Sequence, residues 1–319
     1  WRSIKKYAPH IRVGVVGSTR NEAFLRADAD IDDVFVFSRV PSARVLRDLA
    51  RARGISWDVI LNLYYHDKTG GAIYAALVSP RAYRATLVHH NKEKYERIYS
   101  RVGDRSTSSP LRPIVLQNLD LLTLMLDIPV TGEDAVPSLN HRGSEGANSG
   151  NGSITNRIES RLRANHATDY VILNTDASQT YKEWGFANSL DFTERLAREH
   201  PETMIFWTSA PDRRAAAREA LASRSIPRAE LLETPSLVEL IAALRNARAI
   251  ITPDTSVVHF AAALGVPLLA FYLFESEYPP IGTVSEILYP ADRRNVRTIS
   301  VKEAYEAFRP LFERSRNRS

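Results

Sequence analysis

The chain has 319 residues, which exceeds one ordinary hydrophobic core and favours two domains. Hydrophobic residues make up 44% of it, yet no apolar run is long enough to span a bilayer, and the absence of cysteine excludes disulfides, thiolate metal sites and cysteine nucleophiles. The net charge of +5 favours anionic ligands or an anionic membrane surface, although ordinary surface Arg and Lys side chains account for it equally well.

The first part of the chain alternates predicted strands and helices. Three apolar runs of strand length predict buried strands, at residues 11–17, 32–37 and 57–64. Two segments with helical apolar spacing predict helices, at residues 43–54 and 113–129. Residues 141–156 are rich in Gly, Ser and Asn, which is the composition of a linker.

The alternation resumes after this linker. Strands are predicted at residues 169–175, 203–209, 249–252 and 267–272. Helices are predicted at residues 186–200, 212–224, 236–248 and 255–265. Ser236 and Glu239 have the spacing of a capping box. Buried strands that alternate with helices indicate parallel sheets with helices on both faces, and two such blocks predict two Rossmann-like domains.

A short polar stretch separates the last two predicted strands. Asp254 follows the first of them, at the N-cap position of the next helix. Apolar residues at i, i+3, i+4 and i+7 form the predicted buried face of that helix: Val257, Phe260, Ala261 and Leu264. Thr255, Ser256 and His259 therefore share the other side of its first turn.

This first turn stands at the carboxyl end of a predicted parallel strand, where open α/β sheets bind ligands. Unpaired backbone N–H groups and the positive end of the helix dipole favour an anion there, and we expect the ligand to be a diphosphate. Asp and Thr are also ordinary helix caps, and a lone His is more often structural. From the residues alone, the two interpretations are equally supported.

Residues 252–272 resemble the signature of the ADP-heptose:lipopolysaccharide heptosyltransferases, glycosyltransferase family 9. Five residues match that signature: Asp254, Thr255, His259, Gly265 and Pro267. Ser256 stands where the family usually has Gly, which alters the backbone approach to the donor phosphates. Residues 172–186 resemble a second family segment, in which Lys182 and Trp184 match and Gly185 replaces a Pro. Weaker likeness at residues 3–37 and 57–78 extends the similarity over most of the chain.

The resemblance implies the GT-B fold, with parallel sheets of two Rossmann-like domains facing a central cleft. Domains are then expected at residues 1–145 for the acceptor and 146–300 for the nucleotide sugar. The implied activity is transfer of a sugar, expected to be a heptose, with inversion from an ADP-linked donor. The acceptor would be a lipopolysaccharide core or a similar glycan, and neither metal nor cofactor is expected.

The resemblance also implies a donor site built from eight residues: Thr175, Ser178, Lys182, Asp212, Asp254, Thr255, Ser256 and His259. Lys182 suits the leaving diphosphate because its ammonium group is a compact point charge. Each residue has a plainer alternative. Lys182 could be a solvated surface side chain, Thr175 and Ser178 could be turn residues, and Asp212 could merely cap a helix.

We expect the N-terminal domain to bind the acceptor. His66 and Lys68 follow a predicted strand, and Lys92 lies in a basic segment that suits a phosphorylated glycolipid. An exposed polar loop explains the basic segment equally well. The family begins with a strand whose end carries the candidate general base, whereas the segment at Trp1 resembles the tail of the following helix. We therefore expect the protein to extend upstream of Trp1, with the base in that segment and Asp67 only a weak substitute.

The last segment, residues 301–319, has one apolar helical stripe, and in this fold class we expect it to pack back across the N-terminal domain. A basic amphipathic membrane anchor is the alternative.

We expect a cytoplasmic protein that meets an anionic glycolipid at the inner face of the membrane and binds no nucleic acid. Two rival functions are another nucleotide-sugar enzyme such as an epimerase, and a non-catalytic scaffold of the same fold.

Overall fold

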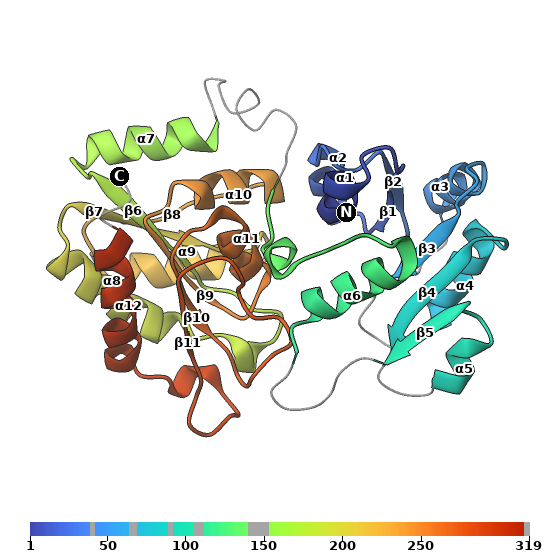
Figure 1. Ribbon diagram of the computed structural model, residues 1–319. Coiled ribbons are helices and arrows are strands. Elements are labelled where there is room, and N and C mark those ends of the chain that lie inside the picture. The colour runs from blue at the N-terminus through green and yellow to red at the C-terminus, as the bar shows by residue number, and fades with distance from the viewer. Residues whose placement is uncertain (39–41, 64–68, 89–91, 105–111, 140–152, 316–319) are drawn as a thin grey trace. The chain divides into compact units, whose positions relative to one another are not determined.

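The computed structural model describes residues 1–38, 42–63, 69–88, 92–104, 112–139 and 153–315. The chain divides into two compact units (Figure 1). The N-terminal unit comprises Trp1–Ala135, and Glu277–Pro279 belong to it as well. The C-terminal unit begins at Val136, earlier than the predicted boundary at residue 146.

One six-stranded parallel sheet forms the centre of the C-terminal unit. Its strands are β6 (Asp169–Asn174), β7 (Thr203–Thr208), β8 (Ala229–Leu231), β9 (Ala249–Pro253), β10 (Leu268–Phe271) and β11 (Ser285–Leu288). They lie in the order β11-β10-β9-β6-β7-β8. The chain therefore winds outward from β6 in one direction, returns, and winds outward again from β9. This is a doubly wound sheet with its topological switch point between β6 and β9.

Helices cover both faces of this sheet. They are α7 (Ile154–Ala164), α8 (Phe186–Glu199), α9 (Arg214–Ala222), α10 (Leu237–Arg245), α11 (Ser256–Leu264) and α12 (Val301–Ser315). One apolar cluster joins alternate strand residues to α8, α9 and α12, and a second joins the intervening residues to α7, α10 and α11. Because both faces are covered, β7 and β9 are buried along their whole length, as the uninterrupted apolar runs predicted.

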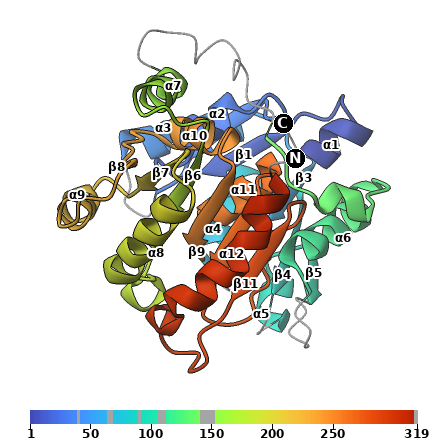
Figure 2. The same cartoon turned by 90° about the vertical axis from the view of Figure 1, so that its left-hand side faces the viewer.

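The last helix, α12, packs on the sheet of the C-terminal unit, and its expected return to the N-terminal domain stays a prediction. Tyr305, Phe308 and Phe312 are buried against the cluster that includes Phe192 of α8. Figure 2 shows α8 and α12 side by side on this face of the sheet. Arg248 fixes the end of α12 by donating to the Phe312 carbonyl over 2.9 Å. The apolar stripe is thus used within its own unit.

The N-terminal unit continues the strand–helix alternation with shorter elements. Its strands are β1 (Gly14–Gly17), β2 (Asp33–Val36), β3 (Val59–Asn62), β4 (Tyr83–Val88) and β5 (Arg101–Asp104). Its helices are α1 (Arg2–Tyr7), α2 (Glu22–Ala27), α3 (Ala43–Arg53), α4 (Thr69–Val78), α5 (Lys92–Glu96) and α6 (Ile114–Leu126). The 3-10 turn η1 (Gly132–Ala135) ends the N-terminal unit, just before the chain enters the C-terminal one at Val136. In the C-terminal unit, a second 3-10 turn, η3 (Val296–Thr298), precedes α12.

The strands of this unit form two separate parallel sheets, β1-β2 and β3-β4-β5. In the part of the chain that the structure describes, β1 pairs only with β2, and β3 pairs only with β4. The prediction of buried strands was therefore wrong for β1 and β3, which are half exposed. Each lacks a hydrogen-bonded neighbour on one side.

Candidate functional site

The carboxyl ends of β6 and β9 meet at the switch point of the C-terminal sheet. These strands are neighbours, with Leu173 opposite Ile251. The loop after β6 contains the 3-10 turn η2 (Thr180–Lys182), and β9 leads through Asp254 into α11. Open α/β sheets bind ligands at this position, because the loops on either side diverge there.

An ion pair joins these two loops. Lys182 Nζ lies 3.0 Å from Asp254 Oδ2, and the two side chains are 23% and 24% exposed. The residues are 72 positions apart in sequence, so the fold rather than the local chain brings them together. The pair is close enough to the surface for a ligand to reach the ammonium group, and it stands beside the start of α11.

The cap of α11 is Thr255, which corrects the prediction that Asp254 caps it. The Thr255 hydroxyl accepts a hydrogen bond from the Val257 amide over 3.3 Å, while the Asp254 carboxylate pairs with Lys182. Ser256 is exposed as the first residue of the helix. The start of α11 is thus a capped helix terminus with its positive dipole end toward Lys182 and Asp254.

His259 is half-buried on the first turn of α11. Burial lowers the pKa of its imidazole below the ordinary value, and the nearby Asp254 carboxylate offsets this only in part. The side chain is therefore neutral at pH 7 and can offer a hydrogen-bond donor or acceptor rather than a positive charge.

The other predicted donor residues differ in accessibility. Thr175 is buried at the end of β6, where its hydroxyl lies within hydrogen-bond distance of Asp176 Oδ1 and the Thr208 carbonyl. Ser178 and Asp212 are exposed, in the loops after β6 and β7. Asp212 does not cap α9, whose N-cap is Arg213 without a side-chain hydrogen bond. The structure thus brings Lys182, Asp254, Thr255 and His259 together most clearly.

Sequence reasoning missed Asn174, the last residue of β6. Its amide nitrogen donates to Thr252 Oγ1 over 3.0 Å and to the Asp176 carbonyl over 3.1 Å, and it lies 3.5 Å from Thr255 Oγ1. Asn174 therefore ties the end of β6 to the end of β9 and to the cap of α11. A polar residue closing an otherwise apolar strand was the signal that could have revealed it.

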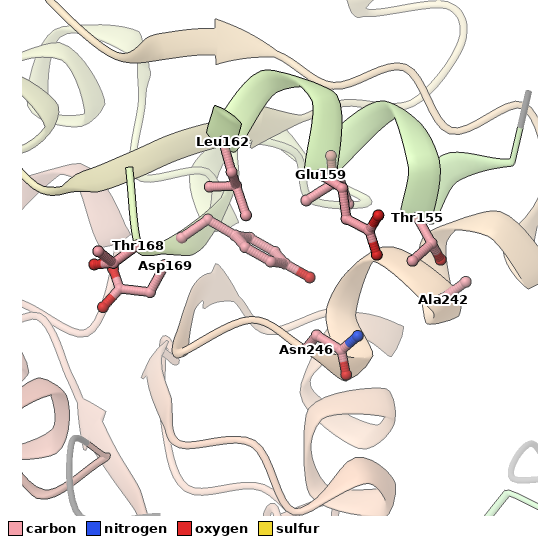
Figure 3. A pocket seen from close by; sticks show the side chains of 9 residues that line it. Thr155, Glu159, Leu162, Thr168, Asp169, Ala242 and Asn246 are labelled. Carbon is pink, nitrogen blue, oxygen red and sulfur yellow. The ribbon is translucent and has the colours of Figure 1, made fainter. Parts of the chain in front are cut away.

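Among the described residues, the cavities of the C-terminal unit include two that differ in their place on the sheet. One, of about 230 Å³, lies between α7, α10 and the start of β6, and Figure 3 shows Thr155, Glu159, Asp169 and Asn246 around it. It is at the amino end of the sheet, away from the switch point. The other, of about 330 Å³, lies beside Thr175 at the start of α8, next to the Lys182 loop. Only the second is at the edge where ligands of such sheets bind.

Comparison with known proteins agrees with this geometry. The sequence model of glycosyltransferase family 9 (heptosyltransferase) matches residues 65–289. The chain belongs to this family. A comparison with curated proteins gave no match.

Three solved structures share the GT-B fold with this family 9 chain. The family 9 glycosyltransferase of Veillonella parvula is 15% identical, with a TM-score of 0.75 over 98% of this chain and 91% of that one. The E. coli ADP-heptose lipopolysaccharide heptosyltransferase II is 15% identical, with a TM-score of 0.73 over 99% and 93%. E. coli heptosyltransferase WaaC with ADP-2-deoxy-2-fluoro heptose is 13% identical, with a TM-score of 0.71 over 97% and 93%.

One departure from the family pattern has a conformational reason. Gly185 adopts a φ of +90° as the N-cap of α8, which Pro, with its φ fixed near −65°, cannot adopt. The neighbouring Trp184 is a core residue: it is 2% exposed, and its indole N–H donates to the Ile299 carbonyl over 2.9 Å. The segment thus keeps the family's Lys and Trp but turns into α8 by a different backbone conformation.

The predicted acceptor residues are only partly visible. His66, Asp67 and Lys68 lie outside the described residues, and Lys92 is the half-buried first residue of α5. Across the described ranges, no group of three or more His, Asp or Glu side chains is arranged to hold a metal ion. Among the helices of those same ranges, none is both long and apolar enough to cross a membrane.

Proposed function

We propose that this family 9 glycosyltransferase moves a heptose, with inversion, from an ADP-linked donor to a lipopolysaccharide core or a similar anionic glycan. The observation that carries the proposal is the Lys182–Asp254 pair at the start of α11, at the switch point of the sheet. The WaaC structure, which contains an ADP-heptose analogue, supports a donor of this class.

The reaction needs stabilisation of negative charge on the leaving diphosphate. In our proposal the Lys182 ammonium meets this charge, and the start of α11 adds the positive end of its dipole. Asp254 holds the ammonium in place, and because two anions would repel each other, its own donor contact would be to a hydroxyl group rather than to the phosphates. Ser256 and His259, on the first turn of α11, and Thr175, Ser178 and Asp212, in the neighbouring loops, complete the proposed donor contacts.

The reaction also needs a carboxylate that takes the proton of the acceptor hydroxyl. We propose that the N-terminal unit supplies the acceptor site, with His66, Lys68 and Lys92 meeting acidic groups of the glycan. Within this chain, Asp67 is the weak candidate that we propose for this base. We propose that no metal or cofactor takes part, and that the enzyme works in the cytoplasm at the inner face of the membrane.

A transfer assay tests the proposal. The protein is incubated with ADP-heptose and a heptose-free lipopolysaccharide core, and the acceptor mass and released ADP are measured. We expect a mass gain of one heptose, with the anomeric configuration inverted by NMR. A rearranged sugar nucleotide without transfer would instead identify an epimerase. Binding of nucleotide without any turnover would identify a non-catalytic paralogue.

A further inference from the structure

The loop that carries Lys182 has a buried carboxylate near each end. Asp176 lies two residues after the end of β6 and is 9% exposed, and Glu183 follows Lys182 directly and is 4% exposed. Burying a carboxylate costs free energy unless other groups bind it. The groups that bind these two carboxylates therefore show what holds the loop in place.

Asp176 ties the start of the loop to the neighbouring strand. Its Oδ2 accepts hydrogen bonds from the Ser209 hydroxyl, over 2.8 Å, and from the Ala210 amide. Both donors directly follow β7. Because the Asp176 carbonyl also accepts from Asn174, backbone and side chain together fix this part of the loop to the ends of β6 and β7.

Glu183 ties the other end of the loop to two arginines. Its Oε1 forms an ion pair with Arg213, after β7, over 2.7 Å. Its Oε2 accepts from Arg297, in η3, over 3.4 Å. Two cations for one carboxylate leave a net positive charge beside the 330 Å³ cavity at the start of α8. Because its charge is taken up by the two arginines, Glu183 does not weaken the attraction of the Lys182 ammonium group for an anion.

Between Asp176 and Glu183 the loop is largely exposed. Residues 178–181 are exposed, and Lys182 is the member whose side chain reaches across to Asp254. A lysine has a long, mobile side chain, so the place of its ammonium group depends on how firmly its backbone is held.

We propose that Asp176 and Glu183 are positioning residues that hold the Lys182 loop so that the ammonium group meets the donor diphosphate at the start of α11. This inference rests on the proposed function. Asp176 and Glu183 do not touch the donor in this account, and they act through Lys182.

A double-mutant cycle tests the proposal. The Kd for ADP is measured by titration calorimetry for the wild type, Asp176→Asn, Glu183→Gln, Lys182→Ala and the two doubles that contain Lys182→Ala. We expect each single carboxylate variant to weaken ADP binding about tenfold, the size of a coupling within one contact network. In the Lys182→Ala background the same changes should alter the Kd by less than about twofold.

A matched control is Glu194→Gln, which removes a carboxylate of α8 that pairs with Arg224 on the surface, 56% exposed. It should leave the Kd for ADP unchanged. If Asp176→Asn lowers the melting temperature more than this control does, Ser209→Ala takes its place, because it removes one donor to the same carboxylate with less disturbance.

The outcomes separate the two proposals. Carboxylate variants that bind ADP as well as the wild type, or that weaken binding equally with and without Lys182, would overturn the positioning role and leave the proposed function standing. A wild-type protein that binds neither ADP, GDP nor UDP would overturn the proposed function and this inference with it.

Discussion

The two units build different sheets from the same strand–helix alternation. In the C-terminal unit six strands pair in one sheet, and inward residues such as Val171 and Ile251 are 0% and 1% exposed. In the described part of the N-terminal unit five strands form two sheets, and Val16 and Leu63 remain 47% and 42% exposed. A ligand site at strand ends is only as well defined as the pairing of those strands. The Lys182–Asp254 site therefore lies on well-paired strands, whereas the described strands of the N-terminal unit, where we propose the acceptor site, are less completely paired.

A Trp→Ala substitution in each unit tests this contrast, and its effect on the unfolding free energy should be the largest of the effects predicted here. Trp184→Ala removes a fully buried ring that lies 4.5 Å from the ring of Phe271, and should cost about 3–5 kcal/mol of unfolding free energy. Trp57→Ala, in the N-terminal unit, removes a half-buried ring and should cost clearly less. Urea unfolding of both variants measures the difference. Equal costs would show that the two units are packed alike.

Lys182→Ala tests the chemical role of the C-terminal site. Loss of one such charge contact in the transition state should lower kcat about 10²–10³-fold under saturating donor, while the melting temperature stays near the wild-type value. Lys302→Ala, which removes an exposed lysine of α12, is the matched control and should retain full kcat. Wild-type turnover in Lys182→Ala would end the assignment of this residue.

Asp134 tests how η1 is held against α1 in the N-terminal unit. Burial alone would raise its pKa, but hydrogen bonds from Lys6, the Thr131 amide and Tyr7 outweigh burial and lower the pKa to about 2. Because the folded-state pKa is depressed, the stabilisation is complete above the unfolded value of 3.8 and is lost as pH falls through about 2. Asp134→Asn should cost roughly 1 kcal/mol at pH 6, since Lys6 is half exposed.

The pH dependence of unfolding checks the Asp134 assignment. The stability difference between the wild type and Asp134→Asn should be constant from pH 7 to pH 5 and shrink between pH 4 and pH 2. A difference that stays constant down to pH 2 would contradict the ion pair with Lys6.

His259 gives the smallest expected effect. Its lowered pKa means that the unfolded chain takes up a proton below pH 6.5 while the folded chain resists it, so stability falls as pH drops from 6.5 through the folded-state pKa. Acidification from pH 7 to pH 5 should lower the melting temperature of the wild type by about 1–2 °C more than that of His259→Gln. Identical pH profiles would show that this imidazole is freely solvated.

Sequence patterns predicted the fold well where burial was complete. Strands β6, β7, β9 and β10 and helices α8 to α11 lie within a few residues of the predicted ranges, because an uninterrupted apolar run between helices can only be a covered strand. The same rule failed for β1 and β3, since it assumes two strand neighbours for each. The short elements β8 and β11 were missed because their few apolar residues give no distinct pattern.

The candidate site could be predicted only in part. Thr255 and His259 were predicted from the helix pattern at a strand end and Lys182 from the family resemblance, but Asn174, Asp176 and Glu183 were not predicted. Their partners outside the loop lie 30 to 114 residues away in sequence, and no local pattern encodes such contacts. The assignment of the α11 cap to Asp254 was wrong for the same reason: its distant partner Lys182 takes the carboxylate, and Thr255 caps the helix.

Titration calorimetry with ADP and AMP tests the central claim most directly. If the Lys182–Asp254 site binds a diphosphate, the β-phosphate adds a charge contact, and wild-type protein should bind ADP at least about tenfold more tightly than AMP. The advantage should shrink severalfold in Lys182→Ala, where only the start of α11 still favours the second phosphate. Equal affinities of the wild type for ADP and AMP, or an ADP preference that is undiminished in Lys182→Ala, would contradict the account.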